Sequence, residues 1–414
     1  DLAQEFSIYP QINLIDLDAA FGTGNNFELI KKICKLCNCN VGGGIRDIDK
    51  AYQMLKIGAK KIIIGTKANK EFLSKLPKEK LIVAIDSKKG KIVDNGWVNQ
   101  TDVKIDERVI ELQNYCDSFL YTYVDKEGTL ESIDINTILK LKKLTKNKII
   151  YAGGISNKNQ IIELDKYDVD TVVGMAYYKN KINLNEIFID LVDFSKYKNL
   201  VPTIVKDNYG QILMLAYSSK KSLFNALKNR QGIYYSRSRK KLWVKGVTSN
   251  NTQKLLNVKI DCDNDTLIFI VKQKNFACHK NNYSCFSEKE FNFEILIDLI
   301  KTRIGTETFT GQMLNDESML KLKIKEESNE VINYTNKENL IWEISDLIYF
   351  LGILMVKNNV EFSDIINELS VRNMKQIVTG NTKWYKNYIK SLNLKKVELI
   401  EVKNKMINLS EIRV

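Results

Sequence analysis

The sequence predicts a multidomain protein in which a parallel α/β unit, a small β-rich α+β unit and an all-α unit follow one another. The chain has 414 residues, 44% of them hydrophobic, and is too long for one ordinary core. Apolar runs of strand length alternate with amphipathic stretches up to about residue 195, and the apolar period then changes twice. We therefore place units at 1–198, 199–288 and 289–375, with a basic tail at 376–414.

The first unit carries repeated strand–helix patterns, which build a parallel sheet. Its predicted strands include residues 12–15, 61–64, 81–85, 148–151 and 171–173. Several of them end in glycine, which at the carboxyl end of a parallel strand lets backbone N–H groups approach a phosphate. We therefore expect a phosphate-binding, TIM-barrel-like unit with Gly44, Gly65, Gly154 and Gly174 at its substrate.

The cysteines are unevenly clustered, which favours free thiols or metal ligands over a disulfide framework. Cys34, Cys37 and Cys39 lie between a predicted helix and a predicted strand. Buried or surface thiols are the favoured interpretation there, and a soft-metal site is the alternative. The chain has a single histidine, which excludes chemistry that needs several imidazoles.

The middle unit shows strand patterns separated by polar turns and holds the densest group of possible metal ligands. Side chains alternate along a strand, so Asp261, Asp263 and Asp265 should share one face while Cys262 points to the other. Three carboxylates on one face suit Mg²⁺, and Cys262 with Cys278 and Cys285 would suit a catalytic Zn²⁺. The alternative is a solvated acidic turn beside free cysteines.

The third unit has apolar residues at helical spacing with acidic residues on the other faces. Glu327 and Glu330 are three residues apart on one predicted helix, and Glu343 and Asp346 are three apart on the next. Packed antiparallel, the two helices would form an acidic pocket that needs Mg²⁺. A solvated face is the alternative, but apolar neighbours such as Leu347 and Phe350 place the second helix in a core.

Charge and hydropathy limit the partners. The net charge of +13 would attract polyanions, but Lys and Asn are spread over the whole chain, which indicates a compositional bias. No run of about 18 apolar residues and no signal-peptide order occur, so we expect a cytoplasmic protein with no membrane partner. Asp1 is not a start methionine, so we expect a chain that is processed or cut from something longer.

Two motifs of the middle unit carry a resemblance to a known family: GQILMLAY at 210–217 and YYSRSRKKLWVKG at 234–246. From about 200 to 287 the chain resembles phosphoribosyl-AMP cyclohydrolase. The resemblance implies that the three cysteines hold zinc, that the three aspartates hold magnesium, and that Arg237, Arg239 and Lys245 bind substrate phosphates. In that family two subunits supply the zinc cysteines, which implies a homodimer.

His279 is then the expected proton-transfer residue. The chain departs from the family at Val247, usually Glu, and at Asn250, usually Gly. These departures put the rate or the local loop geometry in question.

The acidic helix pair reads EExxE at 326–330 and ExxD at 343–346. This pattern resembles the all-α, MazG-like nucleotide pyrophosphohydrolases, and its place after a cyclohydrolase-like block resembles phosphoribosyl-ATP pyrophosphatase over about 291–375. The resemblance implies that Glu327, Glu330, Glu343 and Asp346 bind magnesium. Lys323 and Arg372 are weaker candidates for phosphate binding.

The first unit resembles the ProFAR isomerase that acts on the cyclohydrolase product. The resemblance is carried by residues 41–46, 64–66, 86, 96–97, 127–129 and 152–155. It implies acid–base work by two Asp residues with a nearby Thr, and Asp86 and Thr122 match two of the three. The first strand and its Asp are missing, because residues 1–6 align with the helix after that strand. A lost general base costs about 10² to 10⁴-fold in rate, so we expect an inactive barrel, or residues lost upstream.

The leading hypothesis is a histidine-biosynthesis enzyme that hydrolyses phosphoribosyl-ATP to phosphoribosyl-AMP and pyrophosphate, then opens the adenine ring to give ProFAR. We expect a homodimer through the cyclohydrolase and helical units, and no nucleic-acid partner. One alternative is a nucleic-acid-binding protein that uses the basic and aromatic residues at 237–245. Another is a scaffold that has lost catalysis, and the intact metal ligands count against it.

Overall fold

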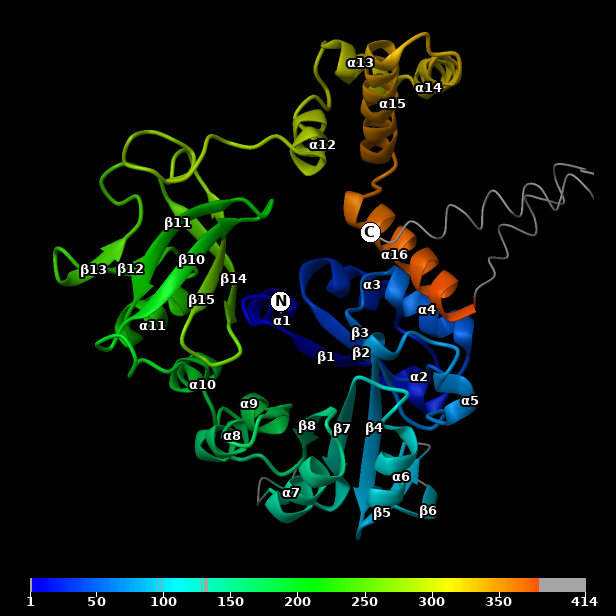
Figure 1. The fold of residues 1–414 in the computed structure, drawn as a ribbon, viewed down its shortest axis with the longest axis vertical. Coiled ribbons are helices and arrows are strands. Elements are labelled where there is room, and N and C mark those ends of the chain that lie inside the picture. The colour runs from blue at the N-terminus through cyan, green and yellow to red at the C-terminus, as the bar shows by residue number, and fades with distance from the viewer. Residues whose placement is uncertain (1, 95, 98, 128, 130–132, 380–414) are drawn as a thin grey trace, which may run out of the picture.

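A curled, mainly parallel sheet forms the N-terminal unit, and helices cover its outer face (Figure 1). The structure is a computed structural model that describes residues 2–379 except 95, 98, 128 and 130–132. The strand order is β1 (Ile12–Ile15), β2 (Cys39–Gly42), β3 (Lys61–Ile64), β4 (Leu81–Lys88), β7 (Ser118–Tyr123), β8 (Lys148–Ala152) and β9 (Val169–Thr171). Within the described residues β1 and β9 do not pair with each other. The prediction of an incomplete barrel is therefore confirmed.

Helices of the first unit alternate with the strands, as expected for parallel crossovers. They are α1 (Leu2–Phe6), α2 (Leu17–Phe21), α3 (Phe27–Leu36), α4 (Ile48–Lys56), α5 (Lys70–Leu73), α6 (Ile105–Leu112), α7 (Ile135–Leu144), α8 (Lys158–Asp165), α9 (Met175–Tyr178) and α10 (Leu184–Leu191), with 3₁₀ turns η1 (Lys78–Lys80) and η2 (Val124–Lys126). An antiparallel hairpin, β5 (Lys91–Asp94) and β6 (Asn99–Lys104), extends β4 beyond the sheet. This hairpin carries Trp97 toward the carboxyl ends of the strands.

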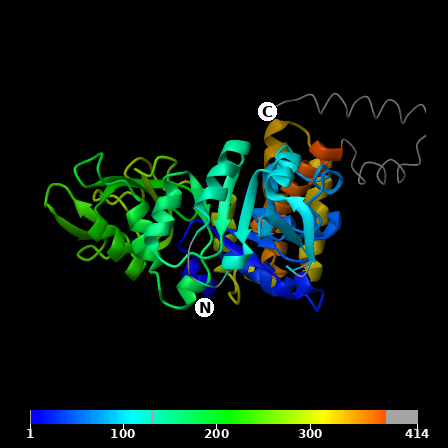
Figure 2. The ribbon, with the colours of Figure 1, turned by 90° about the horizontal axis from the view of Figure 1, so that it is seen from below.

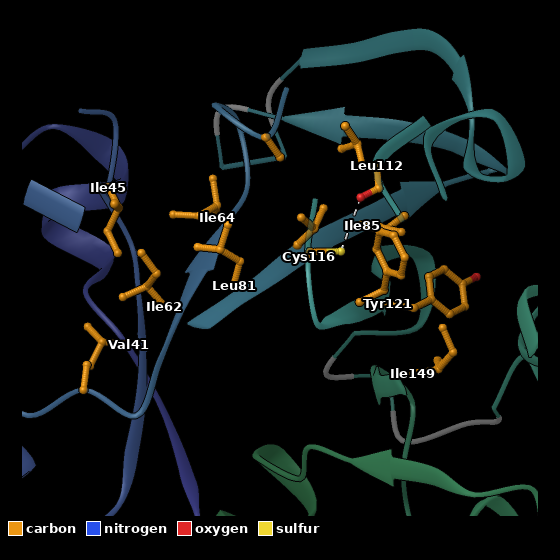
Figure 3. Packing of buried hydrophobic residues seen from close by; sticks show 14 of the residues in the cluster. Val41, Ile45, Ile62, Ile64, Leu81, Ile85, Leu112, Cys116, Tyr121 and Ile149 are labelled. Carbon is orange, nitrogen blue, oxygen red and sulfur yellow. Dashed lines mark hydrogen bonds between the residues drawn. The ribbon is translucent and has the colours of Figure 1, made fainter. Parts of the chain in front are cut away.

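The core of the first unit lies between the sheet and its helices. Alternate strand residues face opposite sides of a sheet, so Ile62 and Ile64 join the main cluster while Ile63 joins a smaller one with Ile82, Leu120 and Ile150. Figure 3 shows Ile62, Ile64, Leu81 and Ile85 packed along neighbouring strands, with Leu112 of α6 nearby. Burial on both faces explains why these strands read as continuous apolar runs.

The middle unit is a four-stranded sheet in the order β11-β10-β15-β14, with one helix and a separate hairpin. Its elements are β10 (Val201–Asp207), β11 (Ile212–Ser218), α11 (Lys220–Asn229), β12 (Ile233–Ser236), β13 (Lys241–Val244), β14 (Gln253–Ile260) and β15 (Leu267–Gln273). The N-terminal segment joins this unit, because Ile8 is only 2% exposed in its core and accepts a hydrogen bond from Val258 N at 2.9 Å.

The third unit is a helical bundle of α12 (Phe293–Lys301), α13 (Phe309–Asn315), α14 (Glu317–Ile332) and α15 (Lys337–Lys357) around Leu320, Phe350 and Ile353. The last described helix, α16 (Phe362–Thr379), leaves the bundle and packs on α4 of the first unit (Figure 1). Val371 of α16 is 1% exposed in the core of the first unit, and Lys56 Nζ lies 2.8 Å from Glu368 Oε2.

Figure 2 shows the middle unit at one end of the molecule and the first unit, with α16 beside it, at the other. The tail predicted from residue 376 begins inside α16. Residues 380–414 of that tail lie outside the described residues.

Candidate metal and substrate sites

The three aspartates of the middle unit lie in a turn. The prediction that they occupy a strand is wrong, because β14 ends at Ile260 and β15 begins at Leu267, and the chain must reverse between them. Asn264 takes a positive φ of 61° there, a conformation that Asn tolerates better than most residues. The reversal still brings one carboxylate oxygen each of Asp261, Asp263 and Asp265 within 4.8 Å of one another.

This acidic turn has a cation beside it. Lys196 Nζ lies 2.9 Å from Asp263 Oδ2 and 2.9 Å from Asp265 Oδ2, and its ammonium lowers the pKa of Asp265. An all-oxygen donor set suits Mg²⁺, so the residues fit the predicted ion. Lys196 balances part of the same negative charge, and sequence reasoning missed it because it lies more than 60 residues away along the chain.

The cysteines divide into a pair and a single residue. The Cys278 and Cys285 side chains share a hydrogen bond. Cys262 is exposed in the acidic turn. Although all three cysteines are described residues, their sulfur atoms do not all lie within 4.8 Å of one another. A hydrogen bond from Lys280 N is the main cause that lowers the pKa of Cys278. Burial, with the neighbouring Cys278, raises the pKa of Cys285. Two converging thiols fit two of the zinc ligands predicted from the sequence.

The loop that carries these thiols is fixed to the turn between β10 and β11. Asp207 is 1% exposed and accepts hydrogen bonds from Tyr283 Oη at 2.8 Å and Gln211 N at 2.8 Å. Cys285 N donates to Leu213 O at 2.7 Å. Asp207 therefore positions the thiol loop, and only the polar turn sequence around it could have suggested this role.

The candidate phosphate-binding residues divide between the thiol loop and the β12–β13 hairpin. Lys245 is buried, which lowers its pKa, while the nearby Cys285 and Cys278 act in the opposite direction. Arg237 and Arg239 are exposed at the β12–β13 turn, and the Arg237 guanidinium lies 3.9 Å from the centre of the Tyr217 ring. His279 is exposed next to Cys278. Lys245 thus lies beside the paired thiols, where its charge suits an anionic substrate, whereas Arg237 and Arg239 lie beside Tyr217 and Trp243.

The acidic helix pair forms a second cluster. Oxygens of Glu327 and Glu330 on α14 and of Glu343 on α15 lie within 4.8 Å of one another. Burial raises the pKa of Glu327, with Asp346 among the charges that add to this effect. A hydrogen bond with Glu343 is the main cause that raises the pKa of Glu330. Carboxylates that raise one another's pKa repel one another, and a hard cation bound between them would reduce that repulsion. These residues therefore fit Mg²⁺.

The other predicted residues of the helical unit lie at different distances from this acidic cluster. Asp346 is exposed and is not part of the group within 4.8 Å. Lys323 Nζ lies 3.8 Å from Glu327 Oε1 and is therefore beside the cluster. Arg372 is on α16, where its Nε lies 2.8 Å from Glu368 Oε1, and the structure does not bring it into this group.

The first unit has a pocket of about 290 Å³ at the carboxyl ends of its strands. It is lined in part by Gly44, Gly65, Asp86, Trp97 and Arg108. The lining does not include Gly154 or Gly174, although both lie within the described residues. Two of the four predicted glycines, Gly44 and Gly65, therefore line this pocket at the strand ends.

The turn after β2 requires glycine. Gly43 and Gly44 have φ values of 94° and 66°. A Cβ at Gly43 would lie 2.2 Å from Asp16 O, and one at Gly44 would lie 2.5 Å from the Ala19 Cβ. Any side chain here would push α2 away from the pocket.

Asp86 lies beside Thr122, because β4 and β7 pair in register at these two residues. Burial raises the pKa of the Asp86 carboxyl, and hydrogen bonds from Thr122 and Trp97 oppose the shift. A carboxyl with a raised pKa beside a hydroxyl is suited to moving a proton.

The N-terminal cysteines make local contacts. Cys37 Sγ donates to Ala3 O at 2.9 Å, and Cys39 Sγ donates to Cys37 O at 3.4 Å. Cys34, Cys37 and Cys39, all described, do not form a group within 4.8 Å. These contacts agree with the favoured interpretation of thiols.

Comparison with known families finds three matches along the chain. The family model described as "Histidine biosynthesis protein" matches residues 1–183. The model of phosphoribosyl-AMP cyclohydrolase matches 214–287, and that of phosphoribosyl-ATP pyrophosphohydrolase matches 292–373. Each match falls within one of the three units described above.

Individual relatives agree with this division. The chain is 36% identical over 205 residues to the histidine biosynthesis bifunctional protein HisIE of Pyrococcus furiosus, which covers 45% of this chain and 98% of that protein. It is 39% identical over 184 residues to an imidazole-4-carboxamide isomerase of Methanocaldococcus jannaschii, covering 42% of this chain and 78% of that one.

A yeast relative is longer. The chain is 34% identical over 274 residues to the histidine biosynthesis trifunctional protein of Saccharomyces cerevisiae, covering 65% of this chain and 34% of that protein. The chain thus spans about a third of the length of this relative.

Proposed function

Since this chain belongs to the family of histidine-biosynthesis proteins that join a phosphoribosyl-AMP cyclohydrolase to a phosphoribosyl-ATP pyrophosphohydrolase, we propose that it catalyses both hydrolyses in series. Phosphoribosyl-ATP would lose pyrophosphate in the helical unit, and the adenine ring of the resulting phosphoribosyl-AMP would open in the middle unit to give ProFAR. The observation that carries this proposal is the presence of two separate clusters of metal-ligand residues, one in each unit.

In the helical unit, Glu327, Glu330 and Glu343, with Asp346 at the edge, would hold magnesium. Magnesium, when bound, polarises phosphate oxygens and neutralises the charge that develops on them. The carboxylates stand on two packed helices, so their spacing is fixed before substrate arrives. Lys323 lies close enough to the cluster to bind a phosphate oxygen, and water then replaces the pyrophosphate group on the α-phosphorus.

In the middle unit, Cys278 and Cys285 would hold zinc, which when bound lowers the pKa of water toward neutrality. Arg237, Arg239 and Lys245 would bind the two phosphates of the substrate and orient its purine ring. His279 is exposed next to Cys278 and can carry a proton between water and the ring nitrogen. Magnesium at Asp261, Asp263 and Asp265 would assist phosphate binding.

We propose that the third zinc ligand is Cys262 from a second copy of the chain. Cys262 does not reach Cys278 and Cys285 within one chain, and its exposure leaves it available to another subunit. The helical unit supports the same homodimer through its exposed apolar residues, which include Leu322 (64%), Ile332 (74%) and Trp342 (74%). Exposed apolar patches of this kind mark protein interfaces.

Trp342→Lys should convert the dimer to monomer or to a weaker dimer, because a charge would be buried at the centre of an apolar interface. Light scattering coupled to size-exclusion chromatography measures the change. Tyr167→Lys is the matched control, since Tyr167 is 40% exposed on the first unit. Equal masses for the wild type and Trp342→Lys would contradict this interface.

For the first unit we propose weak isomerisation, because only one of its two expected acid–base Asp residues is identified. Asp86 and Thr122 are in place, and the isomerase relative supports this type of chemistry, but the open sheet provides no counterpart of the predicted first-strand Asp among the described residues. The pocket beside Asp86 remains suited to a phosphorylated ligand, since glycine turns and Arg108 line it.

The proposed location is the cytoplasm. Among the described residues one helix, α15, is long and apolar enough to cross a membrane by length and composition alone. It packs against α12, α13 and α14 and carries two candidate metal ligands, so it serves as a bundle helix.

Incubation with phosphoribosyl-ATP, Mg²⁺ and Zn²⁺ tests the proposed function. Pyrophosphate release, ring-opened product and isomerised product are followed separately. We expect the first two and little of the third. Absence of all turnover would favour the scaffold hypothesis, and salt-dependent binding to arbitrary oligonucleotides without turnover would favour a nucleic-acid-binding protein.

A further inference from the structure

A cavity lies where the three units meet, away from the sites described above. Its volume is about 980 Å³, at the upper end of the range for small-molecule pockets. The walls come from α1 and α3, from the turn before β3, from β14 and from the first turns of α16. Figure 1 shows α1 lying between β14 and the first unit at this junction.

Two lysines reach this cavity because β14 contains a bulge. Lys254 and Lys259 are five residues apart and would face opposite sides of a regular strand. The pairing with β15 shifts between Leu255 and Asn257, which leaves Leu256 unpaired. One extra residue reverses the alternation, so both lysines are exposed on the same face and line the cavity.

The cavity walls carry an excess of positive charge. Lys60, Arg230, Lys254 and Lys259 all line it, and none has a carboxylate partner among the described residues. Arg230 donates to Glu5 O at 2.5 Å and to Ser7 Oγ at 3.4 Å, which leaves its charge uncompensated.

The acidic residues of the walls are engaged elsewhere. Asp364 lies 2.9 Å from Lys35, and Glu5 accepts a hydrogen bond from Tyr177. Glu5 keeps its negative charge, so the five cations and two carboxylates of the lining leave a net charge of +3, and four of the cations have no ion-pair partner within the part of the chain that the structure describes.

We infer that this junction cavity binds a small molecule carrying two phosphate groups. Two phosphates bear a charge of about −3 to −4 near neutral pH, which is comparable in size with the net charge of +3 on the lining. The volume leaves room for a nucleoside beside the phosphates. Because all three units supply wall residues, a bound ligand would hold them together at a place separate from both hydrolytic clusters and from the barrel pocket.

Cys34 offers a local readout, since it is half-buried and lines the cavity. A hydrogen bond from Cys39 and the charge of Lys60 lower the pKa of the Cys34 thiol, which favours alkylation. The full-length protein is treated with iodoacetamide at increasing pyrophosphate or ADP, without added magnesium, and modification of each cysteine is followed by mass spectrometry. N-acetylcysteine added to the mixture is the reference thiol, because Cys262 is assigned to the zinc site.

We expect either probe to slow alkylation of Cys34 several-fold relative to the added reference thiol. Slowing by pyrophosphate identifies an inorganic diphosphate as sufficient, and slowing by ADP alone shows that the nucleoside is also recognised. The double variant Lys254→Gln/Lys259→Gln should raise the half-saturating concentration about tenfold or more, because two charge-assisted contacts are lost.

Lys146→Gln/Lys228→Gln is the matched control, because both lysines are exposed outside the cavity. The proposal is overturned if neither probe slows alkylation of Cys34, or if the two double variants shift the concentration equally. No turnover is needed for this readout, so failure here and failure of the proposed hydrolyses are distinguishable.

Discussion

Replacing Glu330 by Gln should abolish pyrophosphate release from phosphoribosyl-ATP and leave the opening of supplied phosphoribosyl-AMP unchanged. Glu330 provides one of the oxygens that converge within 4.8 Å, and loss of a residue that only hydrogen-bonds to a metal ligand already costs about 10 to 100-fold at metal sites. We expect a loss of at least about 100-fold. The measurement is a pair of separate assays, one for pyrophosphate and one for the ring-opened product.

Two controls separate this effect from misfolding. Glu338→Gln removes an exposed carboxylate in the first turn of the same α15 that carries Glu343, and it should retain activity. In the absence of metal, Glu330→Gln should not lower the melting temperature, because repulsion from Glu343 and Glu327 is relieved. Loss of both hydrolytic activities in Glu330→Gln would contradict the assignment of two separate sites.

Replacing Cys278 by Ala should abolish ring opening and zinc retention while pyrophosphate release continues. Cys278 is the thiol whose pKa is lowered, through the hydrogen bond from Lys280 N, so it is the readier of the pair to bind metal as thiolate. Without it the remaining ligand cannot hold zinc in a catalytic geometry. Zinc content by atomic absorption and the two assays report the outcome.

A mixing experiment tests whether zinc is shared between subunits. Cys262→Ala and Cys278→Ala should each be inactive in ring opening as pure dimers. Mixed dimers would keep one intact site of two, and about half of randomly paired dimers are mixed, so a 1:1 mixture should recover about a quarter of the wild-type activity. No recovery in verified mixed dimers would contradict a shared site.

Much of the architecture followed from apolar periodicity. The strand run at 61–64 matches β3, because a strand buried on both faces reads as a continuous apolar segment. The run at 12–15 matches β1, although β1 is a half-buried edge strand. The run predicted at 171–173 begins two residues later than β9, which spans Val169–Thr171. The strand stops at Thr171 because its pairing with β8 ends there. β7 was not singled out, because its aromatic and hydroxyl side chains make its apolar run less continuous.

Some residues of the candidate sites could be predicted from local spacing, and others could not. Spacing within one helix brought Glu327 and Glu330 together, since helical neighbours are set locally. The acidic turn was misplaced on a strand, because alternation of Asp residues carries no information about where the sheet must reverse. Asp207 and Lys196 act through contacts distant in sequence, and a single sequence contains no signal for such contacts.

The docking of α16 on the first unit ties the stability of the two halves of the chain together. Val371, on the last described helix, is covered by the core of a barrel that supplies neither hydrolytic cluster. Deleting that barrel would expose Val371 and the face around it, so the hydrolytic half should be less stable and more prone to aggregate when it is produced alone. The first unit is therefore a folding partner of the hydrolytic half, whatever reaction it catalyses itself.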